Sequence, residues 1–118
     1  MKIPLNMGQN GVVSDRITQN KILERDILNT KKGDWTAKAN LAKTFSHLLR
    51  SLAEKRSNDP TQINTLIEAG KEGLFKAAAK FNVKTGADRF HIFALDFVEK
   101  AMDKKLRPGF FARLFGRG

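Results

Sequence analysis

The strongest constraint in the sequence is a set of apolar residues that recur every three or four positions over most of the chain. The segment from Thr61 to Phe81 shows this spacing best, and it places the apolar side chains on one side of a helix. Asp59 and Pro60 stand directly before it, and an N-cap aspartate followed by proline favours a helix start. The residues predicted to be buried are Ile63, Leu66, Ile67, Gly70, Leu74, Ala77, Ala78 and Phe81.

Two further long helices are predicted on either side of this segment. The first runs from Trp35 to about Arg56, and the second runs from about Asp88 to Leu106, where the "RPG" of residues 107–109 is expected to stop it. The apolar side of the first comprises Trp35, Leu41, Phe45, Leu48, Leu49 and Leu52. That of the second comprises Phe90, Phe93, Ala94, Phe97, Val98, Ala101 and Met102.

The beginning of the chain is predicted to be less regular. Residues 1–13 show no clear period, and a short helix is expected from Ser14 or Asn20 to about Asn29. Gly33 suits a C-terminal helix cap and Asp34 suits the N-cap of the next helix.

These patterns predict an all-α fold, a compact bundle of three to four helices, because no segment alternates as a strand would. We expect an N-terminal extension with a short helix (1–32), a helical domain (33–106) and a basic aromatic tail (107–118).

The formal net charge of +10 favours an anionic partner such as nucleic acid, a lipid surface or an acidic protein face. Half of that excess lies from Lys100 onward, where the sequence has six basic residues, one acidic residue and the interleaved Phe110, Phe111 and Phe115. The chain has no cysteine, no apolar run near the length of a membrane span and no secretory h-region. A cytoplasmic location is therefore expected.

Catalytic chemistry is poorly represented, so we expect neither an enzyme nor a cofactor. His47 and His91 are predicted on different helices, with no nucleophile or carboxylate set around them. Glu68 and Glu72 have the spacing of a helical metal pair, but the lysines around them favour a solvated, salt-bridged face, and no metal site is predicted.

Gly70 and Gly73 lie inside the predicted helix, where each costs roughly 1 kcal/mol relative to alanine. We expect the pair to form a flat patch that another helix backbone approaches closely, most simply the helix predicted at 35–56. A G-x-x-G loop of the KH type is the weaker interpretation, because no strands are predicted beside it.

The segments "TLIEAGKEGLFKAAAKFN" (65–82), "VKTGAD" (83–88) and "RFHIFALDFVEKAM" (89–102) resemble region 2 of the bacterial sigma-70 family. The two glycines, the "KF" pair and the turn glycine agree with that family's pattern in order and spacing, and the phenylalanines after the turn fall in register when about one extra residue is allowed near Asp88. Upstream, "KKGDWTAKANLAKTFSHLLRSLAEKR" (31–56) is similar to the family's preceding helix. We expect an isolated, diverged region 2 without the C-terminal helix-turn-helix region.

The resemblance implies a transcription module that docks on the clamp helices of the RNA polymerase core and contacts promoter DNA at the −10 element. The positions that match the polymerase-facing side are Thr65, Glu68, Ala69, Lys71, Glu72 and Phe75. The positions that match or flank the nucleic-acid-facing side are Lys84, Arg89, Phe93, Phe97, Lys100 and Lys104.

Two alternatives remain open at this point. The first is an adapter that kept the fold and binds an anti-sigma factor, another protein or, through its tail, a membrane surface. It is motivated by that tail and by Asp96, which with Phe97 stands where the family has a tryptophan pair. The second is sequence-blind nucleic-acid binding through charge alone, with an affinity that falls steeply with salt.

Overall fold

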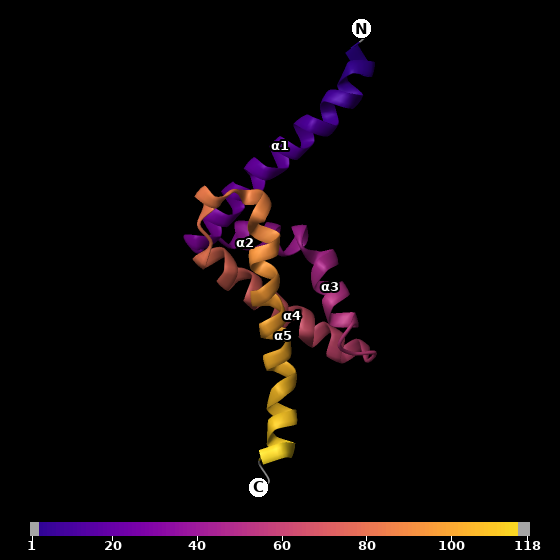
Figure 1. Cartoon of the computed structure of the whole chain (residues 1–118), viewed down its shortest axis with the longest axis vertical. Helices are drawn as coiled ribbons and strands as arrows, with labels where there is room; N and C mark the ends of the chain where they lie inside the picture. The colour runs from indigo at the N-terminus through magenta and orange to yellow at the C-terminus, as the bar shows by residue number, and fades with distance from the viewer. Residues whose placement is uncertain (1–2, 116–118) are drawn as a thin grey trace.

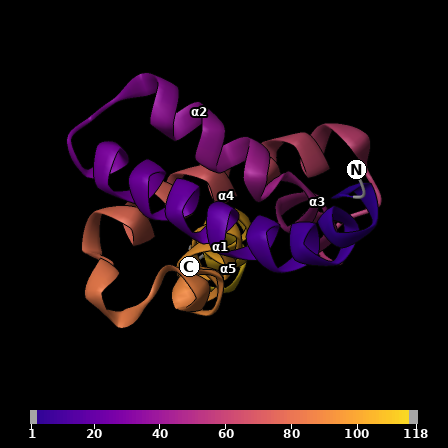
Figure 2. The same cartoon turned by 90° about the horizontal axis from the view of Figure 1, so that it is seen from above.

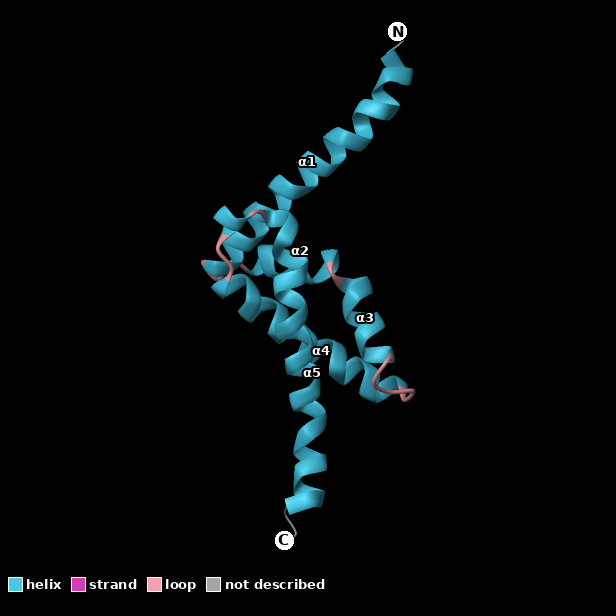
Figure 3. Ribbon diagram, viewed as in Figure 1, coloured by secondary structure: helices cyan, strands magenta, loops and turns pink. Residues whose placement is uncertain are grey.

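All regular structure in the described part of the chain is helical (Figure 3). The computed structural model describes the backbone of residues 3–115 and the side chains of residues 16–106. The predicted all-α class is confirmed, with five α-helices rather than three or four. The elements are α1 (Ile3–Lys31), α2 (Trp35–Thr44), α3 (Ser46–Glu54), α4 (Pro60–Lys80), two 3₁₀ turns η1 (Val83–Thr85) and η2 (Ala87–Arg89), and α5 (Phe90–Phe115).

Helix α4 begins and ends as predicted. The Asp59 carboxylate accepts a hydrogen bond from the Gln62 backbone N–H at 3.3 Å, and Pro60 occupies the first turn, where a missing N–H has no consequence. The helix ends at Phe81, whose backbone is extended. Six of the eight residues predicted to be buried are buried, and the other two, Ile63 and Ile67, pack half-buried against the same core.

Helices α4 and α5 pack against each other at the centre of the molecule (Figure 1). A Cβ added to Gly73 would overlap the backbone carbonyl of Phe97, so α5 crosses α4 at the distance that only glycine permits. Gly70 instead faces the side chains of Met102, Leu49 and Val98. The expectation of a close helix backbone is confirmed at Gly73. The expected partner was wrong, because α5 and not the 35–56 segment makes the approach.

The segment predicted as one helix from Trp35 to Arg56 consists of two helices. Phe45 separates them with φ −102° and ψ 15°, outside the helical region. The Thr44 Oγ1 donates to the Asn40 carbonyl at 2.8 Å, a contact that bends helices, and the Phe45 ring packs edge-on against Phe90 at 5.6 Å. Tertiary packing of Phe45 thus fixes a break at a site with no glycine or proline.

Helices α1 and α2 lie side by side as an antiparallel hairpin (Figure 2). Gly33, with φ 88°, ends the first helix, and Asp34 caps the second by accepting from the Thr36 N–H at 2.9 Å, as predicted. Ile27 of α1 is fully buried, and Lys31 donates to the Ala79 carbonyl of α4 at 3.0 Å. The end of α1 is therefore part of the bundle.

Both outer helices are longer than predicted. Residues 3–13 were expected to be irregular but form the first part of α1, a continuous helix of 29 residues. This part of the helix projects from the bundle, so its sequence does not need apolar residues at regular helical spacing. The "RPG" stop was also wrong, since the backbone of α5 continues to Phe115. A proline removes one backbone hydrogen bond and weakens a helix without necessarily ending it.

The molecule is elongated, with extents of 73 × 30 × 23 Å, because the outer parts of α1 and α5 project from opposite ends of the bundle (Figure 1). Within the described residues, no helix combines the length and apolar character needed to cross a lipid bilayer. The side chains of the predicted basic aromatic tail lie outside the described residues.

Candidate functional site

A groove of about 490 Å³ lies between α2 and α4. From α2 it is lined by Trp35, Lys38, Ala39 and Ala42, and from α4 by Glu68, Lys71, Glu72 and Phe75. We call this surface the α2–α4 groove. Its lining includes two alanines one turn apart and charged side chains of both signs, a combination that suits contact with another protein.

The most exposed large apolar side chain of the described residues, Trp35, stands at the edge of this groove and is 81% exposed. Its burial was predicted and is wrong. Asp34 fixes where α2 starts, and with Ala37 and Leu41 facing the core, Trp35 falls on the other side of the helix. The positions of Ala37 and Leu41 around the helix could have shown from the sequence that Trp35 lies on the exposed side.

Lys38 organises the aromatic residues of the groove. Its ammonium lies 5.9 Å from the ring centre of Trp35 and 5.8 Å from that of Phe75, so one cation contacts a ring from each helix. An exposed aromatic side chain held in this way loses little further freedom when a partner covers it. Lys38 carried no signal of this role in the sequence.

The α4 side of the groove is formed by residues at positions i, i+3, i+4 and i+7. Lys71 pairs with Glu68 at 3.0 Å, Glu72 is exposed, and Phe75 is half-buried beneath them. The structure thus brings together four of the six residues assigned to the polymerase-facing side. Thr65 lies exposed one turn earlier, Ala69 is half-buried, and neither lines the groove.

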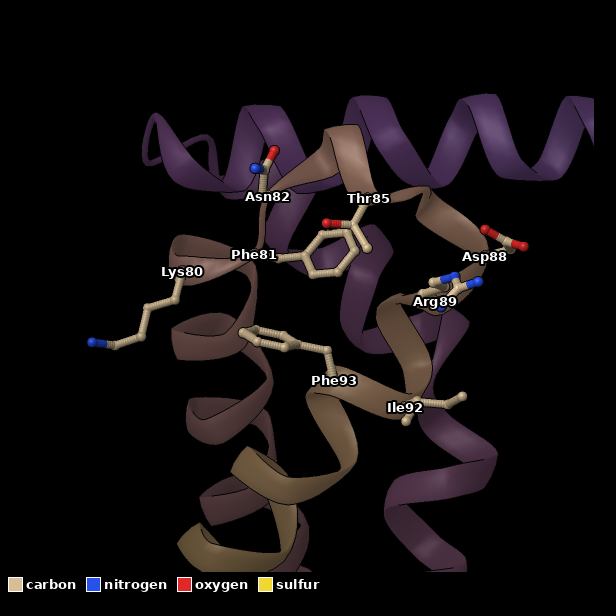
Figure 4. Close-up of a pocket in the computed structure, with 8 residues that line it drawn as sticks. All are labelled: Lys80, Phe81, Asn82, Thr85, Asp88, Arg89, Ile92 and Phe93. Carbon is tan, nitrogen blue, oxygen red and sulfur yellow. The ribbon is translucent and has the colours of Figure 1, made fainter.

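A second cavity, of about 590 Å³, lies where α4 ends and α5 begins (Figure 4). The Phe81 and Phe93 rings are turned toward each other, with ring centres 5.2 Å apart, and Ile92 is 66% exposed beside them. The remaining lining residues are Lys80, Asn82, Thr85, Asp88 and Arg89. We call this surface the aromatic cavity. Aromatic faces with cations nearby suit the stacking of planar, negatively charged groups.

The residues assigned to the nucleic-acid-facing side divide between this cavity and α5. Arg89 and Phe93 line the cavity, and Phe97 packs against Phe93 with ring centres 5.1 Å apart. Phe97, Lys100 and Lys104 continue from Phe93 along one side of α5. Lys84 lies exposed in η1, outside the cavity lining.

Charge on the exposed side of α5 is partly neutralised. Lys100 pairs with Asp96 at 3.2 Å, and both side chains are largely exposed. Such a pair is worth little in water, so the lysine remains available to an anionic partner. In the part of the chain that the structure describes, no three His, Cys, Asp or Glu side chains gather closely enough to hold a metal ion.

Comparison with known proteins found no matching family model, no matching curated protein and no matching solved structure.

Proposed function

We propose that this chain is a transcription module of sigma-70 region 2 type. It docks on the RNA polymerase core through the α2–α4 groove and contacts promoter DNA along α5. The observation that carries the proposal is the gathering of Glu68, Lys71, Glu72 and Phe75 around one groove with an exposed tryptophan. These are four of the six positions that the sequence resemblance assigns to polymerase contact.

The groove has the features of a protein-docking surface. Trp35 offers a large apolar anchor, and tryptophan is among the residues that contribute most to protein interfaces. The small side chains of Ala39 and Ala42 leave room for a partner side chain, while Glu68, Lys71 and Glu72 supply charged groups. A helical partner such as the polymerase clamp would lay its apolar side over Trp35 and Phe75.

Binding of the purified chain to bacterial RNA polymerase core tests docking, with an authentic primary sigma factor as competitor. We expect capture of the core, loss of capture on competition, and at least about tenfold weaker binding for Trp35→Ala. Ile92→Ala is the matched control, because it removes an exposed apolar side chain from the aromatic cavity instead. No binding, or equal binding by the two variants, contradicts the proposal.

The nucleic-acid contact is tested by titrating a single-stranded oligonucleotide of −10 sequence at several salt concentrations. Arg89→Gln is expected to weaken binding and to reduce the salt slope by about 0.7, the value for one phosphate of a single strand, because one fewer phosphate is neutralised. Lys38→Gln removes the same charge from the α2–α4 groove and should leave the slope unchanged. Identical slopes for both variants would argue against nucleic-acid contact at η2, next to the start of α5.

A second candidate function, an adapter that kept this fold without the DNA contact, is favoured by Asp96. Its exposed carboxylate lies on α5 near Phe93 and Lys100, where it would repel a phosphate backbone. If the adapter function holds, the chain binds no −10 oligonucleotide, and Asp96→Asn does not restore binding. If the transcription function holds, Asp96→Asn tightens DNA binding.

A further inference from the structure

A third pocket, of about 350 Å³, lies between the middle of α1 and the end of α2. Its lining residues are Gln19, Asn20, Ile22, Leu23, Asp26 and Thr44. It is formed by the α1–α2 hairpin and shares no residue with the α2–α4 groove or the aromatic cavity. Neither contact of the proposed function uses it.

Asp26 is the unusual residue of this pocket. It is only 5% exposed. Nevertheless, no described residue donates a hydrogen bond to its carboxylate or forms an ion pair with it. A carboxylate removed from water without a partner is costly, and buried charges in proteins are normally paired. Among the described residues, the Asp26 carboxylate therefore has neither a cationic partner nor a hydrogen-bond donor.

The carboxylate is not sealed inside the protein. Among the described residues, Thr30 Oγ1 is the one side-chain polar atom that is both fully enclosed and without a hydrogen-bond partner. The Asp26 oxygens also lack a partner, so they cannot be fully enclosed and must keep some accessible surface. Asp26 lines the pocket, and the small area that it still exposes lies open to a ligand there.

The other polar groups of the pocket can also accept hydrogen bonds. The Thr44 hydroxyl donates its proton to the Asn40 carbonyl at 2.8 Å, so its oxygen is left as an acceptor. Gln19 and Asn20 each offer a carbonyl oxygen. One carboxylate in a pocket whose other polar groups can accept hydrogen bonds suits a group that carries a positive charge and several N–H donors. It is a poor match for a divalent metal ion, which prefers more carboxylates.

The apolar residues define the rest of the ligand. Ile22 is 42% exposed and Leu23 is half-buried, and together they form an apolar wall beside the polar groups. A methylene stem would lie along this wall while the charged end reaches Asp26. We propose that this pocket binds an ammonium or guanidinium group carried on an aliphatic stem, supplied by a free alkyl amine or guanidine or by a lysine or arginine side chain of a peptide.

The overall charge of the protein makes this inference specific. A chain with a net charge of +10 repels small cations, so general electrostatic attraction would not concentrate them at its surface. Binding that depends on Asp26 would consequently report the pocket itself and not a diffuse effect of charge.

The test measures the melting temperature of the full chain with agmatine, whose aliphatic stem carries a guanidinium group at one end and an ammonium group at the other. We expect the melting temperature to rise with agmatine concentration and to remain unchanged with tetramethylammonium, a cation without an N–H donor. A short peptide with one central arginine forms the second arm. If the melting temperature rises with agmatine alone, the natural ligand is a free small molecule. If it rises with both compounds, or with the peptide alone, the natural ligand is a side chain of a peptide.

Asp26→Asn is expected to weaken agmatine binding about tenfold or more, because a hydrogen-bonded charge pair is lost. Glu24→Gln is the matched control, since it removes the same charge from an exposed position of α1 and should leave binding unchanged. Thr44→Val, at an exposed position, should weaken binding to a smaller extent. The pocket is not a cation site if agmatine and the peptide both fail to raise the melting temperature, or if Asp26→Asn binds as well as the unmodified chain.

Without ligand, Asp26→Asn should melt at or above the temperature of the unmodified chain, because an unpaired buried charge is removed. A lower melting temperature would mean that the carboxylate has a structural partner inside the fold. That result would overturn the inference on its own, even if the variant were too unstable for a binding measurement.

Discussion

The α4–α5 interface and the α1–α2 hairpin both bury helix surfaces, but they do so with different side chains. Between α4 and α5, glycine meets backbone and the surrounding residues, such as Leu74, Val98 and Met102, are apolar and fully buried. Within the hairpin, two polar residues, Asp26 and Thr30, are buried without any described hydrogen-bond partner. The first region is therefore packed through apolar side chains and glycine, whereas the second encloses polar side chains that have no described partner.

The largest effect is expected from Phe90→Ala, on the apolar side of this comparison. Phe90 is fully buried and packs edge-on against Phe45 at 5.6 Å and Phe81 at 5.2 Å, so it joins the α2–α3 break to the start of α5. Its truncation should lower the free energy of unfolding by about 3–5 kcal/mol, measured by urea denaturation. Leu23→Ala, at a half-buried position of the hairpin, should cost clearly less. Equal losses would remove the contrast between the two regions.

Gly73→Ala tests the close approach of α4 and α5. The added Cβ would meet the Phe97 backbone, which cannot move aside as a side chain can, so we expect a loss of about 1–3 kcal/mol by thermal denaturation. Gly70→Ala is the matched control. Its Cβ would lie 2.7 Å from the Met102 Cε and 2.8 Å from the Leu49 Cδ2, both ends of flexible chains. The gain in helix propensity should offset that strain and leave stability nearly unchanged.

Helix boundaries were predictable where a local signal exists. Asp59 with Pro60 and Gly33 with Asp34 are such signals, and each marks the boundary that the structure has. Phe45 has no such signal, because its backbone departs from helical geometry to pack its ring against Phe90. A break that depends on a residue 45 positions away cannot be read from nearby sequence.

The surfaces were predictable only in part. The spacing of Glu68, Lys71, Glu72 and Phe75 places them on one side of α4, but nothing in that spacing indicates that α2 forms the other wall of the groove. Asp26 was missed for a related reason. An aspartate in an amphipathic helix is normally solvated, and its burial depends on how α2 folds back over α1.

Asp34→Ala and Asp59→Ala test whether the two regions also differ at their helix starts. Both aspartates accept a hydrogen bond from a first-turn backbone N–H, at 2.9 Å for Asp34 and 3.3 Å for Asp59. Each variant should therefore lose about 1 kcal/mol in the same thermal denaturation measurement. A much larger loss for one of them would show that the contrast between the regions extends beyond their interiors.

Thr30→Val is expected to have the smallest effect and the opposite sign. The Thr30 hydroxyl is enclosed in the hairpin without a partner, and valine replaces it with a methyl group of similar size. Because the buried hydroxyl has lost water without gaining a hydrogen bond, we expect the free energy of unfolding to rise by up to about 1 kcal/mol. Thr65→Val is the matched control, since that exposed hydroxyl donates to the Thr61 carbonyl at 3.1 Å and its loss should bring no gain.

The sign of the Thr30→Val effect decides how the hairpin should be understood. A gain would mean that the hairpin keeps polar groups at the expense of stability, in agreement with an unpartnered Asp26 one turn away on the same helix. A loss would mean that the hydroxyl is satisfied in solution, by water or by a shifted neighbour. In that case the hairpin interior would be as well satisfied as the α4–α5 interface, and the contrast between them would be one of side-chain type alone.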